Sequence, residues 1–119
     1  MKYTETHEWI HLEGQVGIIG ITEHAQKQLG DIVFVELPKI GRTVKAGDEI
    51  AVLESTKAAA DVYTPVSGTI LEVNESLKEI PEKINQDPEK AGWIYKIQLS
   101  DVNEVEKLLD FSAYELITK

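Results

Sequence analysis

The sequence predicts a mainly β fold with small helices, an α+β class. Short runs rich in Ile, Val and Leu follow one another between residues 8 and 99. Gly, Pro, Asn and Asp separate these runs, which is the pattern of strands joined by turns. After Asp101 the apolar residues change to helical spacing, and 119 residues fit one domain. We therefore expect a single domain with a β core and a helical tail over 101–119.

The N-terminal part predicts a hairpin and a capped helix. Residues 8–20 hold two apolar runs that meet at a turn around Gly14. Thr22 is the expected N-cap of a short helix that ends at Leu29, because a threonine oxygen satisfies free N–H groups there. Gly30 follows as the stop, since glycine adopts the backbone conformation that ends many helices.

The middle of the chain predicts three further strands. Residues 32–37 are β-branched and aromatic, and Pro38 ends them. Residues 50–53 and 62–66 form two more apolar runs. The segment between them is short and rich in small residues, and it contains Lys57. These two strands should therefore form a hairpin with a lysine at its tip.

The C-terminal part predicts two strands and several short helices. Thr69–Val73 and Trp93–Leu99 are strand-like, whereas 85–88 has the composition of a loop. Residues 76–79 have capping-box spacing but meet Pro81, so one or two helical turns are expected.

The tail beyond Asp101 is expected to be helical, with four apolar side chains on one face. These are Val102, Val105, Leu108 and Leu109. Residues 112–115 match a second capping box, and Phe111 with Leu116 would complete it as a hydrophobic staple.

Composition excludes several classes of function. Twelve basic and 21 acidic residues give a net charge of −9, which repels nucleic acid and anionic membrane surfaces. No apolar run approaches the roughly 20 residues of a membrane span. Residues 1–6 lack a signal or transit pattern, so we expect a cytoplasmic protein, or a mitochondrial one if this is a processed eukaryotic form. The absence of cysteine excludes disulfides, thiolate nucleophiles and cysteine metal sites.

Catalytic and metal motifs are also absent. The histidines at 7, 11 and 24 lack the spacing of metal ligands and are expected to be ordinary surface or core residues. Ser55 lies two residues before Lys57, but no G-x-S-x-G motif or base accompanies it. We therefore expect no catalytic residues and no metal.

Lys57 is the one residue that the sequence marks for a chemical role, because small residues surround it. Ala58-Ala59-Ala60 follow it directly, and a tight tip of this kind leaves its amine clear of bulky neighbours. A lysine amine on a flexible stem is a common target of covalent modification. The hairpin therefore indicates an attachment site, although most lysines at hairpin tips are simply solvated.

The hairpin resembles the lipoyl and biotinyl attachment hairpins. Gly47-Asp48, Glu54-Ser55-Thr56-Lys57-Ala58 and Pro65-Val66-Ser67-Gly68 carry this resemblance. Biotinyl hairpins usually place Met on both sides of the lysine, so Thr56 and Ala58 favour lipoate. In lipoyl domains a Glu three residues before the lysine and a Gly eleven after it help the attaching enzyme, and Glu54 and Gly68 occupy those positions.

The whole chain also resembles the H proteins of the glycine cleavage system. The resemblance rests on His7-Glu8-Trp9, residues 20–25, residues 29–38, Asn85-Gln86-Asp87-Pro88 and Gly92-Trp93. It implies a barrel-sandwich hybrid with a lipoyl-like core at about 16–100 and lipoate in amide linkage to Lys57. The protein would then be a monomeric, non-catalytic carrier in glycine catabolism and one-carbon metabolism.

The same resemblance implies four partners and a binding cleft. Glycine decarboxylase would load an aminomethyl group, aminomethyltransferase would remove it, dihydrolipoamide dehydrogenase would reoxidise the dithiol, and a lipoate-attaching enzyme would modify Lys57. The positions that match the cleft for the loaded arm are Thr6, Glu8 and Asp61. Carboxylates suit a cationic amine, since charge-assisted hydrogen bonds are strong.

Two alternatives remain open from the sequence. An H-like lipoyl protein could serve another pathway, such as sulfur oxidation or the relay of lipoyl groups to 2-oxoacid dehydrogenases. A non-lipoylated homologue could act as an interaction module in which Lys57 is incidental.

Overall fold

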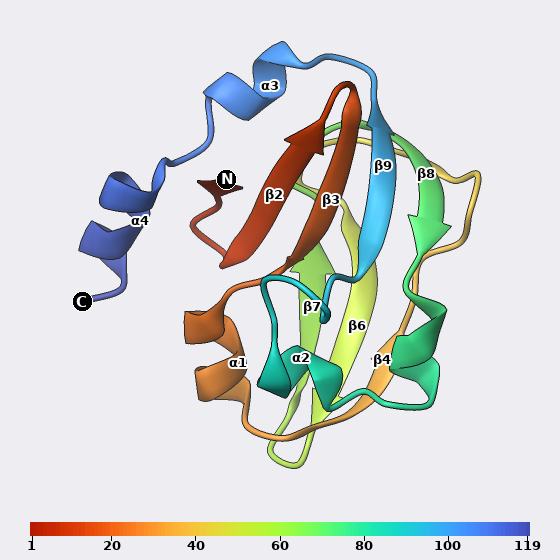
Figure 1. The fold of residues 1–119 in the computed structure, drawn as a ribbon, viewed down its shortest axis with the longest axis vertical. Coiled ribbons are helices and arrows are strands. Elements are labelled where there is room, and N and C mark those ends of the chain that lie inside the picture. Colours follow the sequence, from red (N-terminus) through yellow and green to blue (C-terminus); the bar gives the residue numbers. More distant parts are fainter.

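A computed structural model describes residues 1–119, and it forms two β sheets with short helices around them (Figure 1). The strands are β1 (Lys2–Tyr3), β2 (Glu8–Glu13), β3 (Val16–Ile21), β4 (Ile32–Glu36), β5 (Thr43–Val44), β6 (Glu49–Ser55), β7 (Ala59–Tyr63), β8 (Gly68–Val73) and β9 (Tyr95–Leu99). The helices are α1 (Glu23–Leu29), the 3₁₀ helix η1 (Glu75–Lys78), α2 (Lys83–Gln86), α3 (Asn103–Glu106) and α4 (Phe111–Ile117).

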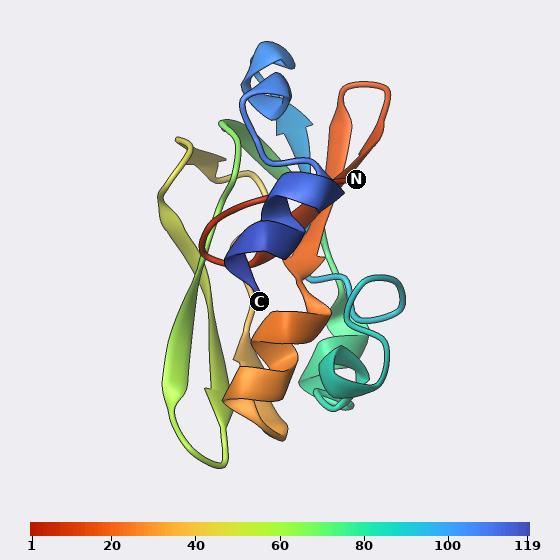
Figure 2. The ribbon, with the colours of Figure 1, turned by 90° about the vertical axis from the view of Figure 1, so that its left-hand side faces the viewer.

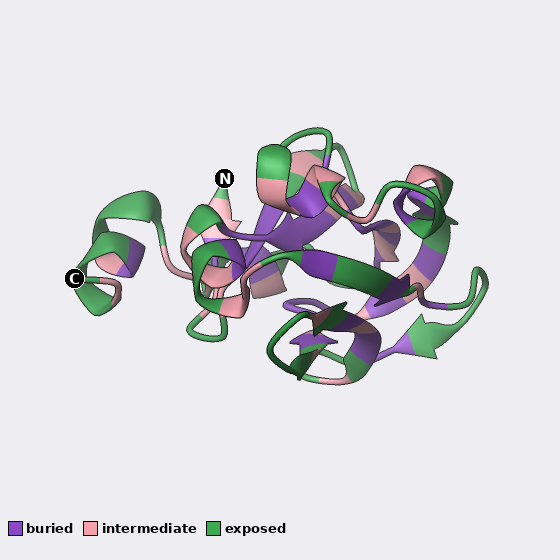
Figure 3. Cartoon of the chain, turned by 90° about the horizontal axis from the view of Figure 1, so that it is seen from below, coloured by how far each residue is buried: buried purple, intermediate pink, exposed green.

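The two sheets share one core. The larger sheet has the order β1-β2-β3-β9-β8-β5, and the smaller has the order β4-β6-β7. Ile10 and Ile97 of the larger sheet and Leu53 of the smaller belong to one buried hydrophobic cluster. Figure 3 shows the buried segments inside and the exposed ones in loops and at the C-terminal end. The mainly β class with small helices is confirmed, and the arrangement is consistent with a barrel-sandwich hybrid.

The N-terminal predictions are confirmed in detail. Strands β2 and β3 pair in the predicted hairpin, and Gly14 has a φ of 64° in its turn. The Thr22 hydroxyl accepts from the Ala25 N–H at 3.2 Å, so it caps α1 as predicted. Gly30 ends the helix with a φ of 83°, a conformation that glycine adopts without steric cost.

The second strand of the lysine hairpin was predicted at the wrong place. The prediction gave 62–66, whereas β7 covers Ala59–Tyr63. Glu54 pairs with Ala59 and Leu53 with Ala60, so pairing with β6 overrides the helical preference of the alanines. The other end of the predicted strand is lost because Thr64 bonds locally to Val66, and Pro65 has no N–H to donate.

A helix replaces the first half of the loop predicted at 85–88, whereas Asp87 and Pro88 lie outside the helices and strands as predicted. Asn85 and Gln86 belong to α2, and the Asn85 side chain reaches across to α1. Its amide donates to the Gly30 carbonyl at 2.8 Å, while its oxygen accepts from the Ile32 N–H at 2.9 Å. These long-range bonds explain the helix, since nothing local in the sequence specifies it.

The predicted capping boxes do not form. The helix α4 begins one residue before Ser112, because the Asp110 carboxylate accepts from the Ala113 N–H at 2.9 Å and is the true cap. Phe111 and Leu116 are 58% and 68% exposed, so they make no staple. The Ser76 hydroxyl bonds to Asn74, and η1 is a single 3₁₀ turn, which agrees with the short helix predicted before Pro81.

The predicted strand at 93–99 and the tail helix are both shorter than expected. Strand β9 begins at Tyr95, and α3 covers only Asn103–Glu106. Of the expected apolar face, Val105 is buried, but Val102 is 41% exposed.

The two ends of the chain meet beside β2. Tyr3 exchanges two backbone hydrogen bonds with Leu109, at 2.8 and 2.9 Å. The Tyr3 ring stacks on Tyr114 of α4 with ring centres 4.8 Å apart. The N-terminal strand and the C-terminal helix therefore support each other, far from the lysine hairpin (Figure 1).

Candidate functional site

Lys57 lies at the exposed tip of the β6–β7 hairpin, which projects beyond both sheets (Figure 2). The Ser55 hydroxyl accepts from the backbone N–H groups of Lys57 and Ala58, both at 3.1 Å. The Thr56 N–H donates to the Asp31 carbonyl at 3.0 Å. These bonds fix the backbone of the tip and leave the lysine side chain outside it.

The Lys57 side chain lies over Gly30, at the end of α1. A Cβ atom placed on Gly30 would lie 3.4 Å from the Lys57 Cε and 3.8 Å from its Nζ. These are ordinary contact distances, so the lysine stem packs against the end of α1.

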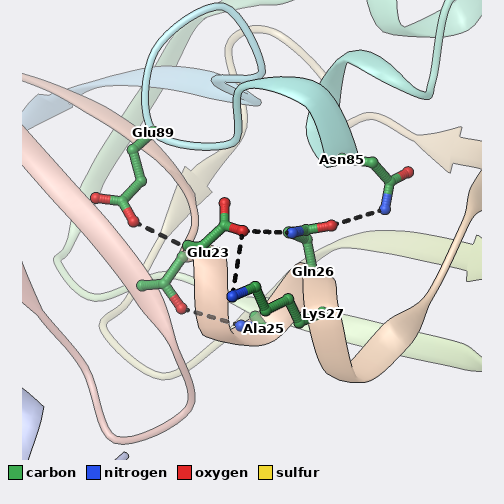
Figure 4. Close-up of polar contacts among 7 residues, drawn as sticks. Glu23, Ala25, Gln26, Lys27, Asn85 and Glu89 are labelled. Carbon is green, nitrogen blue, oxygen red and sulfur yellow. Dashed lines mark hydrogen bonds and ion pairs between the residues drawn. The ribbon is translucent and has the colours of Figure 1, made fainter.

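Polar contacts along α1 hold this helix in place (Figure 4). Glu23 accepts from the Gln26 side chain at 2.8 Å, and its own N–H donates to Glu89 at 3.1 Å. Gln26 in turn accepts from Asn85 at 3.0 Å. Since α2 and the following loop supply these partners, segments far apart in sequence fix the helix beside the hairpin.

Glu8 is the buried acid of the molecule, with 2% of its surface exposed. The Thr4 hydroxyl donates to its Oε1 at 2.6 Å, and the Thr6 hydroxyl donates to the same atom. The Tyr63 N–H donates to its Oε2 at 3.2 Å. Burial raises the pKa of Glu8, and these hydrogen bonds partly oppose that shift because they favour the ionised form.

Thr6, Glu8 and Asp61 line one pocket of about 190 Å³. It lies between α1, which contributes Gln28 and Leu29, and β7, which is an edge strand of the smaller sheet. Leu29 of this lining directly precedes Gly30, the residue that the Lys57 stem contacts. The structure thus brings together the three residues predicted for the cleft.

Asp61 lies on the outer face of the smaller sheet, unlike Thr6 and Glu8. It pairs with Val52, which pairs with Glu36, so these three side chains share the outer face of the smaller sheet. Asp61 therefore borders the pocket at the strand edge, whereas Glu8 lies inside the protein.

Glu54 lies near the hairpin tip, whereas Gly68 lies at the opposite end of the molecule. Glu54 is exposed on β6, in the last cross-strand pair before the tip. Gly68 begins β8, at the end of the molecule opposite the hairpin tip (Figure 1). A Cβ atom there would lie 2.0 Å from the Gln98 carbonyl oxygen, so close packing against β9 requires glycine.

His7 also lines the pocket, although the sequence predicted only an ordinary surface or core histidine at this position. Its φ is 72°, and its Nδ1 lies 2.8 Å from the Tyr114 hydroxyl, which lies 2.7 Å from the Thr22 hydroxyl. Burial lowers the pKa of His7, and the neighbouring His24 lowers it further. No local pattern signals this role, because the contact spans 107 residues.

The structure contains no cluster of metal-binding side chains and no membrane-spanning helix. No group of three or more His, Cys, Asp or Glu side chains is placed to hold a metal ion. None of the helices combines the length and the apolar character needed to cross a membrane.

Comparisons with known proteins agree on one family. The family model described as glycine cleavage H-protein matches residues 1–119. A glycine cleavage system H protein of Thermotoga maritima is 58% identical over 114 residues, covering 96% of this chain and 92% of the relative. One from Escherichia coli is 54% identical over 118 residues, covering 98% and 92%. The crystal structure of a glycine cleavage system H protein from Mycobacterium marinum superposes with a TM-score of 0.86 at 41% identity, covering 95% of this chain and 91% of that one.

Proposed function

This chain belongs to the glycine cleavage H-protein family, and on that premise we propose that it is a lipoylated, non-catalytic carrier. It shuttles the aminomethyl group of glycine from glycine decarboxylase to aminomethyltransferase and presents its dithiol to dihydrolipoamide dehydrogenase. We further propose that it works as a cytoplasmic monomer. Its domain would comprise a lipoyl-like core at about 16–100 and a helical tail at 101–119.

The position of Lys57 is the observation that carries the proposal. Its amine is exposed at a tip whose backbone is fixed by Ser55 and Asp31. An amide link at this nitrogen would place an arm of about ten bonds, each of about 1.5 Å, beyond the backbone. That length allows the end of the arm to enter a partner's active site while the domain stays outside.

Lipoate would supply the chemistry that the chain lacks, since its disulfide accepts the aminomethyl group and the electrons. The residues of this chain fit the loaded arm. The pocket of about 190 Å³ is lined by Thr6, Glu8 and Asp61, and also by Leu29, next to the glycine that the lysine stem contacts. Ionised Glu8 would accept hydrogen bonds from the cationic amine, Thr6 would orient that carboxylate, and Asp61 would add negative charge at the rim. Enclosure in the pocket would exclude water from the loaded group.

The attaching enzyme would recognise the hairpin through Glu54, which is exposed near the tip. Gly68 was predicted for the same role. Its distance from the tip favours an indirect contribution, through the packing of β8 against β9. We therefore propose Glu54 as a direct contact of that enzyme and Gly68 as a residue that preserves the shape of the domain.

Glycine–bicarbonate exchange with a glycine decarboxylase component tests the pathway. The lipoylated protein should support exchange, and the unlipoylated protein should not. Intact mass verifies the loading, because one lipoyl group must be present before exchange is measured. A fully lipoylated protein that supports no exchange with its cognate decarboxylase would instead indicate a lipoyl carrier of another pathway.

Loss of the aminomethyl group from the loaded carrier tests the cleft. We expect Glu8→Ala to release ammonia and formaldehyde about 10-fold faster than the wild type, since a charge-assisted hydrogen bond is lost. Glu13→Ala, which changes an acid at the other end of β2, serves as a matched control. Equal release rates for Glu8→Ala and the wild type would remove Glu8 from the cleft.

A further inference from the structure

An aromatic side chain lies exposed beside the lysine hairpin. Phe34 of β4 is 53% exposed, and its neighbour Val33 is 55% exposed. Phe34 pairs with Glu54, and Glu54 pairs with Ala59, so the three residues form a row across the outer face of the smaller sheet. We call Phe34, Glu54 and Ala59 the outer row.

The outer row is close to Lys57. Glu54 and Ala59 form the last cross-strand pair before the tip, and Lys57 follows Glu54 by three residues. At about 3.3 Å per strand residue, Glu54 and Ala59 lie within about 10 Å of the lysine backbone, and Phe34 lies one strand spacing, about 5 Å, further. Ala59 is small, so a partner could lie flat across the hairpin and contact Phe34.

The charges around the row favour a basic partner. Asp31, Glu36, Glu54 and Asp61 are all exposed on or beside this face. The basic residues Lys39 and Arg42 line one pocket with Glu36 and Asp61, at the end of β6 away from the tip. Their positive charge offsets the acids there, so the acidic charge that favours a basic partner is that of Asp31 and Glu54, nearer the tip. A second copy of this chain is disfavoured at the β4 edge, because acidic side chains would then meet and like charges repel.

From this geometry we propose that the lipoate-attaching enzyme docks on the outer row, with an apolar pocket for Phe34 and basic residues around its rim. This inference rests on the proposed function and extends it to a binding surface. In the attachment step, the Nζ–carbon bond forms, the amine loses a proton, and the bond between the acyl carbon and its activating group breaks. The lysine amine must itself enter the active site, because no arm yet spans the distance. The enzyme surface must therefore lie against the hairpin around Lys57, where the outer row is exposed.

The three enzymes of the glycine pathway face a different constraint. They reach the end of an arm that adds about 15 Å, so their surfaces need not touch the outer row. Loss of the Phe34 contact should therefore slow the attachment of lipoate and leave the reactions of the glycine pathway unchanged.

The test compares Phe34→Ser with Phe111→Ser, a matched control because Phe111 is 58% exposed on α4. The initial rate of lipoyl mass gain is measured with the attaching enzyme and an activated lipoyl donor. For Phe34→Ser, kcat/KM should fall about 10-fold through KM, as for an aromatic residue central to an interface. Phe111→Ser should match the wild type, and both variants should keep its thermal stability.

Two further measurements complete the test. The Kd of the unlipoylated chain for the attaching enzyme should rise by a similar factor in Phe34→Ser. Phe34→Ser that is fully lipoylated by long incubation should support glycine–bicarbonate exchange at the wild-type rate. Equal attachment rates for Phe34→Ser and the wild type would overturn the inference, as would an equal loss in attachment and exchange. A wild-type chain that never gains lipoyl mass would contradict the proposed function itself.

Discussion

The hairpin tip and the turn that precedes Glu8, the first residue of β2, differ in how they hold their functional groups. At the tip, local backbone bonds to Ser55 fix the chain and leave Lys57 in solvent. In the turn, hydrogen bonds from Thr4, Thr6 and Tyr63 hold a carboxylate that is almost fully buried. One region keeps its group accessible, whereas the other encloses it.

Because of this difference, substitutions in the two regions should affect function and stability differently. Substitutions at the tip should change the chemistry of the protein and leave its stability intact, since few tertiary contacts are lost. Substitutions in and around the turn should change both, because removing a partner of a buried polar group has a free-energy cost.

Lys57→Arg should have the largest effect on function and almost none on stability. The guanidinium of arginine keeps the charge but offers no amine for the amide link, so no lipoyl mass should be gained. Intact mass after incubation with a lipoylating enzyme measures this, and Lys39→Arg is the control. Lys57→Arg that still gained the lipoyl mass would contradict the assignment of the attachment site.

Gly68→Ala should destabilise the fold by about 3 kcal/mol or more, because its Cβ meets backbone that cannot move aside. The contact is the Gln98 carbonyl oxygen at 2.0 Å. Thermal or denaturant unfolding measures the change. If Gly68→Ala is as stable as the wild type but is lipoylated slowly, then Gly68 acts in recognition at the tip.

Glu8→Gln should flatten the pH dependence of stability. Because the folded pKa of Glu8 is raised, its proton is held more tightly in the folded state. That contribution is complete below the usual carboxyl pKa of about 4.5 and is lost as the pH rises through the raised value. The wild type should lose up to about 1.4 kcal/mol per pH unit relative to Glu8→Gln in that window. Urea unfolding at several pH values measures this, and parallel curves would contradict the raised pKa.

Tyr114→Phe should have the smallest effect, a loss of about 1 kcal/mol, because its hydroxyl bonds to His7 and Thr22. The stacking on Tyr3 should persist, since the ring is unchanged. Urea unfolding measures the loss, and Tyr63→Phe is the control. An unchanged stability would show that this bridge between α4 and the turn is dispensable.

Local sequence signals predicted the parts of the fold that depend on local interactions. The hairpin at 8–20 and the helix from Thr22 to Gly30 follow from turn and capping residues, and the structure confirms both. The helix α2 depends on partners distant in sequence, Gln26 and Gly30. The start of β7 depends on cross-strand pairing with β6, at Glu54 and Ala59, which overrides the local helical preference of the alanines. No single-sequence pattern contains that information.

The candidate site likewise depends on tertiary contacts that local sequence patterns do not report. Lys57 stands out from its neighbours in the sequence, whereas Glu8 is one of 21 acidic residues and has no local mark of burial. The resemblance to a family indicated Thr6, Glu8 and Asp61, and the fold places them around one pocket. His7 and Gln28 join that pocket through tertiary packing alone. Their roles could not be derived without coordinates.

The pairing of Tyr3 with Leu109 has a consequence for how the protein can be attached to other molecules. Both termini lie on one side of the molecule, away from the β6–β7 hairpin (Figure 1). A linker from either end to a scaffold or a partner enzyme would therefore leave the hairpin unobstructed. Joined by such a linker to glycine decarboxylase, the carrier would work at an effective concentration set by linker length, up to the millimolar range. The fold thus permits fusion to a partner without blocking Lys57.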